Sequence, residues 1–351
     1  MREPYEDLID DIHREVMDKM IKKVLVLEDL IPPYNQLSEP VNDIEFIYEP
    51  GALGVDDLIK RIKIDPFIQG IICSLNQEIT ADVFHALPQL RVIANIAVGL
   101  NNIDLSAAKK HGVKVAHTPK VLTDATADLA WALLLGGVRR LAEGDRLVRS
   151  GQWRGWAIDQ LLGTSMGYTV NVDQELTKKR LGIIGLGQIG QAIAQRAKGF
   201  NLDVVYHNRT PYPQLEQENN WSYLGLEELL SSSDYVVLAL ALTQETHHIL
   251  DKNRLKLMRT NAYLVNVGRG ALIDEMALID CLESGHLSGA ALDVYEYEPK
   301  VPQRLKALPQ VTLSPHLGSA TIETRQAMSR LVIESAKSVL MEEKLKGYFV
   351  T

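Results

Sequence analysis

The sequence predicts an α/β protein built from two doubly wound domains, each with a parallel sheet covered by helices. Short apolar runs alternate with helix-like segments along the chain, roughly 20–30 residues apart, which is typical of βαβ units. The chain has 351 residues, which is long for a single hydrophobic core. Its 46% hydrophobic and 23% charged residues are ordinary for a globular protein. Two domains are therefore expected.

The apolar runs of strand length fall into two series, one for each sheet. The first series is 23–27, 44–48, 70–73, 91–96 and 113–116. The second series is 181–184, 203–206, 235–239, 262–266, 289–293 and 311–314. We expect one domain at 1–117, completed by a C-terminal helical segment at 319–351, and a second domain at 118–318.

The remaining segments are predicted to be helical or irregular. Residues 5–21 are acidic and amphipathic, which indicates an accessory helix, and 321–342 form the last helix. A long apolar helix is expected over 118–151, with Pro119 as its first helical residue. Residues 151–174 follow as an irregular stretch with Trp153 and Trp156. A loop of that length is usually functional or part of an interface.

The overall charge and the cysteines restrict the partners and the compartment. A net charge of −8 argues against nucleic acid and against anionic membranes as partners. The N-terminus does not resemble a signal peptide, and no apolar run is long enough to span a membrane. Cys73 and Cys281 lie in apolar contexts without metal-like spacing. We therefore expect reduced core cysteines, no metal site and a cytoplasmic protein.

A glycine-rich turn, Gly185-Leu186-Gly187-Gln188-Ile189-Gly190, joins the strand at 181–184 to a helical pattern. The first glycine permits a tight turn, and the second lets the backbone approach a pyrophosphate. The third lets the helix pack close to the strand. The N–H groups at the helix N-terminus favour an anion. The turn therefore predicts a dinucleotide-binding site.

The end of the next strand bears on the choice of dinucleotide. An acidic residue here ordinarily binds the ribose hydroxyls of NAD, but this chain has Asn208, Arg209 and Thr210. A guanidinium beside an amide and a hydroxyl suits the 2′-phosphate of NADP(H). The alternative is that Arg209 is a solvated loop residue. We expect NADP(H) to be preferred and NAD(H) to be possible.

Four ionisable residues follow strands of the second series. Arg269 comes after 262–266, Asp293 lies at the end of 289–293 with Glu298 five residues on, and His316 comes after 311–314. Singly, each is explained by a surface charge or a structural histidine. Together they lie at the carboxyl edge of one sheet, where open α/β sheets bind ligands. Their joint placement favours a catalytic site.

These motifs resemble those of the D-isomer-specific 2-hydroxyacid dehydrogenase family over nearly the whole chain. The resemblance rests on 185–190, 266–270, 293–299, 314–319 and 121–128. Within the family, 121–126 and the Asn208–Thr210 turn look most like the glyoxylate/hydroxypyruvate reductase branch. The family implies a Rossmann-type cofactor domain and a flavodoxin-like substrate domain.

The resemblance also implies roles for individual residues. Arg269 would bind the carboxylate and carbonyl of a 2-oxo acid, and His316 would protonate the carbonyl oxygen. Glu298 would fix the imidazole tautomer and keep the ring protonated near neutral pH. The residues expected at the substrate besides Arg269 are Leu75, Val98 and Gly99. Those expected at the cofactor besides the two turns are Thr126, Thr246, Val267 and Asp293, the last near the nicotinamide carboxamide.

The function implied is reduction of small 2-oxo acids, glyoxylate and hydroxypyruvate first, to D-2-hydroxy acids. The resemblance also implies a homodimer in which Trp156 reaches the partner subunit's active site. D-lactate-type and other D-2-hydroxyacid dehydrogenases, phosphite oxidation and a cofactor-sensing binding protein remain alternatives. Glu298 argues against a formate dehydrogenase. The chain departs from the family pattern at Ala241 and in the long loop 162–178.

Overall fold

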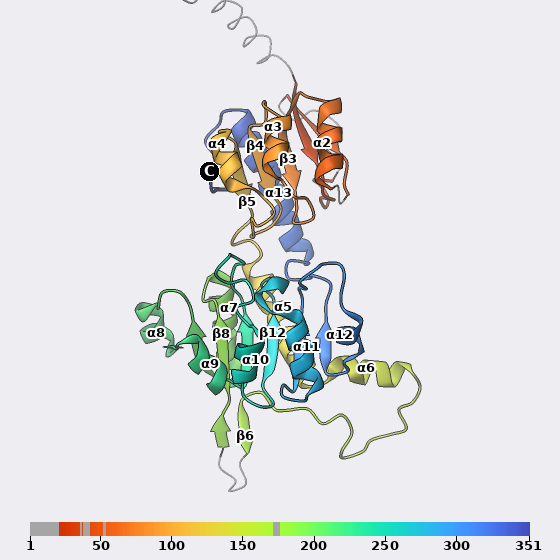
Figure 1. Cartoon of the computed structure of the whole chain (residues 1–351), viewed down its shortest axis with the longest axis vertical. Helices are drawn as coiled ribbons and strands as arrows, with labels where there is room; N and C mark the ends of the chain where they lie inside the picture. The colour runs from red at the N-terminus through yellow and green to blue at the C-terminus, as the bar shows by residue number, and fades with distance from the viewer. Residues whose placement is uncertain (1–20, 36, 38–42, 52–53, 171–175) are drawn as a thin grey trace, which may run out of the picture. The chain divides into compact units, whose positions relative to one another are not determined.

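The computed structural model describes residues 21–35, 37, 43–51, 54–170 and 176–351. The chain divides into two compact units (Figure 1). The first contains the residues up to Val121 together with Thr321–Thr351, and the second is Leu122–Ala320. The accessory helix predicted at 5–21 falls almost wholly outside the described residues.

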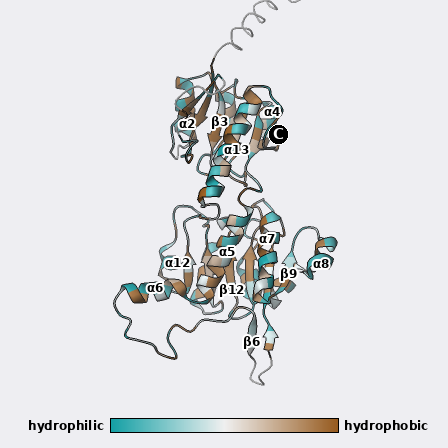
Figure 2. Cartoon of the chain, turned by 180° about the vertical axis from the view of Figure 1, so that it is seen from behind, coloured by the Kyte–Doolittle hydropathy of each residue, from teal (hydrophilic) through white to brown (hydrophobic). Residues whose placement is uncertain are grey.

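The first unit is built on one mostly parallel sheet with the strand order β15-β5-β4-β3-β1-β2. Apolar side chains of α2, α3 and α4 form one buried cluster with side chains of this sheet. Helix α13 packs against β3, β4 and β5 (Figures 1 and 2). Of the strands described in this sheet, β15 alone runs antiparallel to its neighbour. The strands are β1 (Lys22–Val26), β2 (Ile44–Tyr48), β3 (Ile68–Cys73), β4 (Val92–Asn95), β5 (Lys114–His117) and β15 (Tyr348–Phe349). The helices are α2 (Val55–Ile64), α3 (Ala81–Ala86), α4 (Leu105–Lys110) and α13 (Ile322–Leu340).

The second unit is built on a fully parallel sheet with the order β10-β9-β8-β11-β12-β13-β14. The strands are β8 (Arg180–Ile184), β9 (Asp203–His207), β10 (Ser222–Tyr223), β11 (Tyr235–Leu238), β12 (Tyr263–Asn266), β13 (Gly289–Leu292) and β14 (Val311–Leu313). The helices are α5 (Thr123–Val138), α6 (Leu141–Arg149), α7 (Gln188–Ala197), α8 (Pro213–Asn219), α9 (Leu226–Ser232), α10 (Lys252–Leu257), α11 (Glu275–Glu283) and α12 (Gln303–Ala307), with 3-10 turns η1 (Lys198–Phe200) and η2 (Gly270–Leu272).

Both faces of this second sheet are buried. Along β11, Val237 joins an apolar cluster with α5 and α7, while Val236 joins another with α9, α10 and α11. A strand covered on both faces needs apolar side chains on both, which explains the continuous hydrophobic run of β11. Figure 2 colours the chain by hydropathy. Chain order reverses at β8, because β9 lies on one side of it and β11 on the other. Ligands bind open sheets at the carboxyl ends beside such a reversal.

The predicted fold class is confirmed, and every predicted strand is present within two residues of its expected bounds. The helix predicted over 118–151 is wrong in two respects. Lys120 has a left-handed backbone (φ 70°), so α5 begins at Thr123 and not at Pro119. Arg140 is also left-handed (φ 53°), which ends α5 and turns the chain into α6.

Sequence reasoning also missed three short pieces of sheet. The hairpin of β6 (Tyr168–Val170) and β7 (Leu176–Lys178) falls in the segment expected to be a long loop, 162–178, and β10 and β15 were not predicted. Cys73 and Cys281 are free and buried, as expected. Among the described residues, we find no helix with the length and apolar character that crossing a membrane requires.

Candidate active site

The glycine turn has the geometry that its sequence predicts. Gly185 has φ 98°, and a Cβ there would lie 2.6 Å from the Cβ of Leu240. A Cβ on Gly190 would lie 2.0 Å from the carbonyl oxygen of Gly185, so only glycine lets α7 pack this closely. At Gly187 a Cβ would meet nothing within 4 Å. Gly185 and Gly190 are therefore required by packing, whereas Gly187 leaves open space.

That open space suits the phosphates of a dinucleotide. Gly187 is the N-cap of α7 and provides no side-chain cap, so the first N–H groups of a ten-residue helix have no capping acceptor from it. Gln188 and Ile189 form the first turn, and Ile189 packs against the apolar cluster beneath. A pyrophosphate approaching Gly187 would meet backbone N–H groups and the positive end of the helix dipole.

The turn after β9 presents polar groups to solvent. Arg209 and Thr210 are exposed, and the Asn208 side chain donates to the Thr210 carbonyl oxygen over 3.3 Å. Glu245 lies on the loop after β11, close enough to Arg209 for their charges to interact. A hydrogen bond from Thr243 is the main cause that lowers the pKa of Glu245, and Arg209 contributes. Arg209 therefore shares its surroundings with a carboxylate.

His316 and Glu298 form the central pair of the site. The Nδ1 atom of His316 lies 2.8 Å from Oε2 of Glu298, and each side chain is 36% exposed. The other carboxylate oxygen of Glu298 accepts from the Tyr295 N–H over 3.0 Å. Burial would raise the pKa of Glu298, but the hydrogen bond and charge of His316 lower it overall. The pair therefore combines an accessible imidazole with an ionised carboxylate.

Asp293 holds the loop that carries His316. Its Oδ1 accepts from the Ser314 hydroxyl (2.6 Å) and the Leu317 N–H (2.7 Å), and its Oδ2 accepts from the Gly318 N–H (2.8 Å). The side chain is buried, and burial raises its pKa against the effect of these hydrogen bonds. Both carboxylate oxygens are thus engaged inside the protein, whereas the family resemblance placed Asp293 near the nicotinamide carboxamide.

Thr126 ties the same loop to helix α5. Its hydroxyl lies 3.0 Å from the Gly318 carbonyl oxygen and 2.9 Å from that of Leu122, and it is buried. His316 itself has a left-handed backbone (φ 55°), which is uncommon for a residue with a side chain. Such strain persists where the surroundings enforce it, as Asp293 and Thr126 do here.

Arg269 lies just beyond β12, on a turn held by Asn266. The Asn266 amide donates to the Arg269 carbonyl oxygen (2.8 Å) and accepts from the Gly268 N–H (3.0 Å). Burial lowers the pKa of Arg269, while the negative charge of Glu298 raises it, and an arginine remains charged in either case. The structure therefore brings Arg269, Glu298 and His316 into one electrostatic neighbourhood.

The remaining predicted cofactor residues lie on nearby strand ends. Val267 is buried beyond β12, and its N–H donates to the Leu238 carbonyl oxygen over 3.3 Å. The Thr246 hydroxyl donates to the Ala241 carbonyl oxygen and lies 2.7 Å from the Thr243 N–H. Thr246 thus organises its own loop.

The predicted substrate residues of the first unit follow β3 and β4. Leu75 is half-buried just past β3. Beyond β4, the Val98 carbonyl oxygen faces Nδ1 of His117 (3.0 Å), and that of Gly99 accepts from Asn95 (2.9 Å). These contacts fix the turn through its carbonyl groups.

A hollow of about 1050 Å³ also lies in the first unit, but at the other end of its sheet. It is lined by Gln69, Arg91 and Lys114, at the amino ends of β3, β4 and β5. Leu75 and Val98 follow the carboxyl ends, where ligands of open α/β sheets bind. We do not assign the hollow to the catalytic site.

Sequence reasoning gave no role to Asn266 or Ser314, although both positions fall within the recognised motifs. Asn266 shapes the turn before Arg269, and Ser314 binds the Asp293 carboxylate. A possible signal was their position: each is a polar residue at the end of an apolar strand. Buried polar side chains require hydrogen-bond partners, which makes such positions organisers of loops.

Comparisons with known proteins show the family to which this chain is similar. The family model described as "D-isomer specific 2-hydroxyacid dehydrogenase, NAD binding domain" matches residues 131–318. A glyoxylate reductase of Pyrococcus horikoshii is 42% identical over 316 residues, covering 90% of this chain and 92% of that protein.

Solved structures show the same likeness. An NADPH-dependent glyoxylate/hydroxypyruvate reductase of Sinorhizobium meliloti, in complex with NADP and malonate, has a TM-score of 0.80 and 30% identity over 94% of this chain and 97% of that one. A glyoxylate reductase of Paecilomyes thermophila has a TM-score of 0.82 and 31% identity, covering 94% and 98% of the two chains.

Proposed function

This chain belongs to the D-isomer-specific 2-hydroxyacid dehydrogenase family, and we propose that it is an NADPH-preferring reductase of glyoxylate and hydroxypyruvate. As a member of the family it is an NAD(P)-dependent oxidoreductase of small 2-oxo acids. The observation that carries the proposal is the 2.8 Å contact of His316 with Glu298 beside the charge of Arg269. The products would be glycolate and D-glycerate.

Arg269 would bind and orient the substrate. Its guanidinium presents several N–H donors in a fixed plane, which matches a carboxylate and the adjacent carbonyl oxygen. Asn266 holds the backbone turn from which the arginine extends, and Nη1 of Arg269 donates to the Gly268 carbonyl oxygen over 2.7 Å. A fixed positive charge also stabilises the negative charge that develops on the carbonyl oxygen during reduction.

His316 would supply the proton. Because Nδ1 faces Glu298, the proton delivered to the substrate carbonyl oxygen leaves from Nε2. Glu298 then remains paired with the Nδ1–H group and fixes the neutral tautomer. General acid catalysis of this kind is typically worth about 10²–10⁴-fold in rate.

The cofactor would lie over the carboxyl ends of the second sheet, in the domain proposed at 118–318. When bound, the nicotinamide supplies the hydride of the reduction. The N-terminus of α7 would hold the pyrophosphate, with Gly187 providing the space. Leu75, Val98 and Gly99, in the substrate domain proposed at 1–117 and 319–351, would contact the substrate.

The turn after β9 supports a preference for NADPH. Arg209 is an exposed cation at the position where NAD-binding proteins ordinarily have an acidic residue. It could form charge-assisted hydrogen bonds with a 2′-phosphate, aided by the hydroxyl of Thr210. The carboxylate of Glu245 opposes this, because it lies near Arg209 and would repel the phosphate. The preference is thus set by the balance of two opposite charges.

Initial rates with glyoxylate and either NADPH or NADH test this balance. Arg209→Ala should raise the KM for NADPH about tenfold, as expected for one charge-assisted contact, and leave that for NADH little changed. Glu245→Gln should lower the KM for NADPH and also spare NADH. Equal use of both cofactors by the wild-type protein would refute the preference. So would an equal effect of Arg209→Ala on both.

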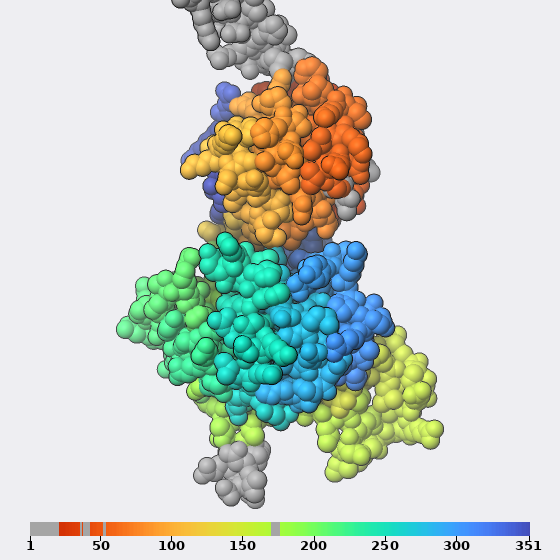
Figure 3. All heavy atoms as spheres, viewed as in Figure 1, coloured from red at the N-terminus to blue at the C-terminus, as the bar shows by residue number. Residues whose placement is uncertain are grey.

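The segment after α5 supports a homodimer. Helix α6 and the loop after it are drawn in yellow-green in Figure 3. Helix α6 has no buried residue, and apolar side chains along this segment are exposed. They are Leu141, Val148, Trp153, Trp156, Ile158 and Leu162, with Trp156 84% exposed. Large exposed apolar side chains gathered on one segment favour an interaction site, and aromatic residues are enriched at interfaces. We expect a second copy of this chain to cover it.

A further inference from the structure

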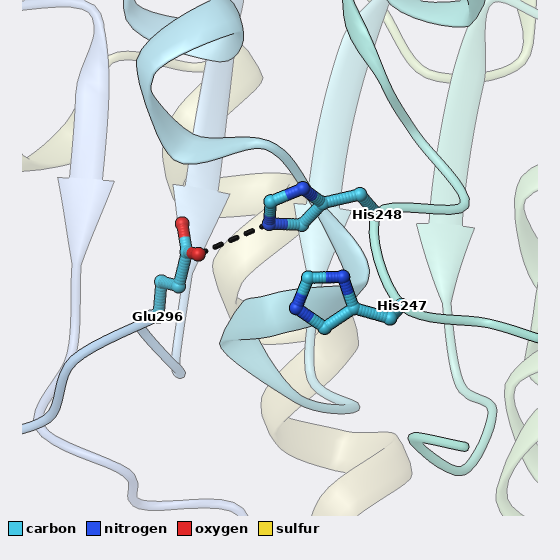
Figure 4. Close-up of side chains that lie close together, drawn as sticks. All are labelled: His247, His248 and Glu296. Atoms are coloured by element: carbon cyan, nitrogen blue, oxygen red, sulfur yellow. Dashed lines mark hydrogen bonds and ion pairs between the residues drawn. The ribbon is translucent and has the colours of Figure 1, made fainter. Parts of the chain in front are cut away.

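We propose that His247, His248 and Glu296 form a binding site for a divalent transition-metal ion of the zinc class, apart from the catalytic pair. The three side chains approach one another on the second unit (Figure 4). Their candidate ligand atoms all lie within 4.8 Å of one another, and Nε2 of His248 lies 3.0 Å from Oε1 of Glu296. None of these three residues has a role in the reduction described above.

The backbone explains how two consecutive histidines reach the same place. In extended chain, neighbouring side chains point to opposite sides. His248 instead has a left-handed backbone (φ 49°), and its N–H donates to the Ala271 carbonyl oxygen over 2.8 Å. Its ring therefore lies over that of His247, with centroids 4.0 Å apart, and both rings extend toward Glu296 (Figure 4).

The donor atoms select the class of ion. Two imidazole nitrogens and one carboxylate oxygen are ligands that Zn²⁺ accepts, with a fourth position left for water. Magnesium and calcium prefer sets made of oxygen alone. Without a metal ion, the contact between Nε2 of His248 and Oε1 of Glu296 is favourable only when a proton lies between the two atoms. A metal ion would take the place of that proton and would use the same two atoms.

The surroundings suit a cation. The Glu296 side chain is only 13% exposed, whereas His248 is 31% exposed and His247 is open to solvent. The N–H of Glu296 donates to Oε1 of Glu275 over 3.4 Å, and Glu275 is a buried carboxylate. Two carboxylates on one side and accessible imidazoles on the other would attract an ion and admit it from solvent.

A bound ion would join two segments distant in sequence. The histidines lie on the loop before α10, and Glu296 lies on the segment after β13. The second segment also packs on η2, where a Cβ on Gly270 would lie 1.8 Å from the Tyr295 carbonyl carbon. Because the ion binds only when both segments are folded, its binding should stabilise the second unit.

Isothermal titration of the purified full-length protein with ZnCl₂ tests the site, with MgCl₂ as the hard-ion comparison. We expect one zinc per chain and no magnesium signal. His247→Gln changes an exposed side chain and should weaken zinc binding at least about tenfold, the lower end of what loss of an outer-shell partner causes. Glu296→Gln should do the same. The zinc-induced rise in Tm should disappear in both variants.

Two further variants serve as controls. His85 and His111 also form a close ring pair, 5.0 Å between centroids, but their Nδ1 atoms face backbone carbonyls of their own helices. His85→Gln should therefore leave zinc binding unchanged. His316→Gln should also leave it unchanged, because the catalytic pair is a separate site. Zinc binding that survives His247→Gln, or that is lost in either control, overturns the proposal.

Discussion

His316 is held from two directions. Glu298 contacts its ring at Nδ1, while the Asp293 carboxylate accepts hydrogen bonds from the Ser314 hydroxyl and from the backbone N–H groups of Leu317 and Gly318. The first contact sets which nitrogen carries the proton, and the second sets where the ring lies. Asp293 is therefore a positioning residue, and its removal should affect catalysis without touching the imidazole.

Asp293→Asn tests this role. The amide keeps one acceptor oxygen but replaces the other with an NH₂ group, so one backbone N–H, at Leu317 or Gly318, loses its acceptor. An unsatisfied buried donor costs about 1–3 kcal/mol, and we expect the free energy of unfolding to fall by that amount. The kcat should fall with it, while the KM for NADPH changes little. Urea unfolding and steady-state kinetics measure both.

Ser314→Ala is the matched control, because it removes one donor and leaves the carboxylate and both N–H groups in place. It should cost less in stability and in kcat than Asp293→Asn. If Asp293→Asn instead raised the KM for NADPH and left kcat and stability unchanged, Asp293 would act on the cofactor, as the family resemblance implied.

At the scale of elements, the unit of strand, turn and helix at 180–197 contains two glycines that serve different purposes. Gly190 is required because α7 lies against the turn, whereas Gly187 faces open space. Substitutions at the two positions should therefore have different consequences, although both lie in one motif.

Gly190→Ala should lower the free energy of unfolding by about 1–3 kcal/mol, because its Cβ would overlap the Gly185 carbonyl oxygen. Gly187→Ala should leave stability within about 1 kcal/mol and raise the KM for the cofactor, because its methyl group would occupy the phosphate space. Thermal unfolding with cofactor titration distinguishes them. Equal destabilisation by both changes would contradict this assignment of roles.

Some of the strands and helices could be predicted from the sequence, and others could not. The central strands, such as β11 and β12, were predictable because both of their faces are covered, which makes each of them an uninterrupted apolar run. The start of α5 was not, because the left-handed backbone at Lys120 leaves no mark in the residue type. The strands of the β6–β7 hairpin are only three residues long each, which is too short for a clear pattern.

The site was predictable to a similar degree. Arg269, Glu298 and His316 follow strands of one sheet, so topology alone brings them together. The role of Asp293 depends on which hydrogen-bond donors reach a buried carboxylate, and this follows from the path of a loop. The rings of His247 and His248 lie together near Glu296 for the same kind of reason, because the left-handed backbone at His248 redirects its ring.

At the scale of the whole molecule, the exposed apolar segment after α5 is the feature that a single chain leaves unexplained. Trp156→Ala should weaken the expected homodimer and alter the KM for the 2-oxo acid. The reason is that the family resemblance implies that Trp156 reaches the active site of the partner subunit. Light scattering at micromolar concentration, with kinetics on the same sample, measures both. A fully active wild-type monomer under these conditions would refute the homodimer.

The most direct test of the central claim is the pH profile of NADPH oxidation in the presence of glyoxylate. His316→Ala should lose about 10²–10⁴-fold in kcat at every pH while binding NADPH as the wild-type protein does. Glu298→Gln should retain more activity in acid and lose it at a lower pH than wild type, because the imidazolium lacks its anionic partner. These results would establish His316 as the proton donor. Near-wild-type reduction by His316→Ala would contradict it.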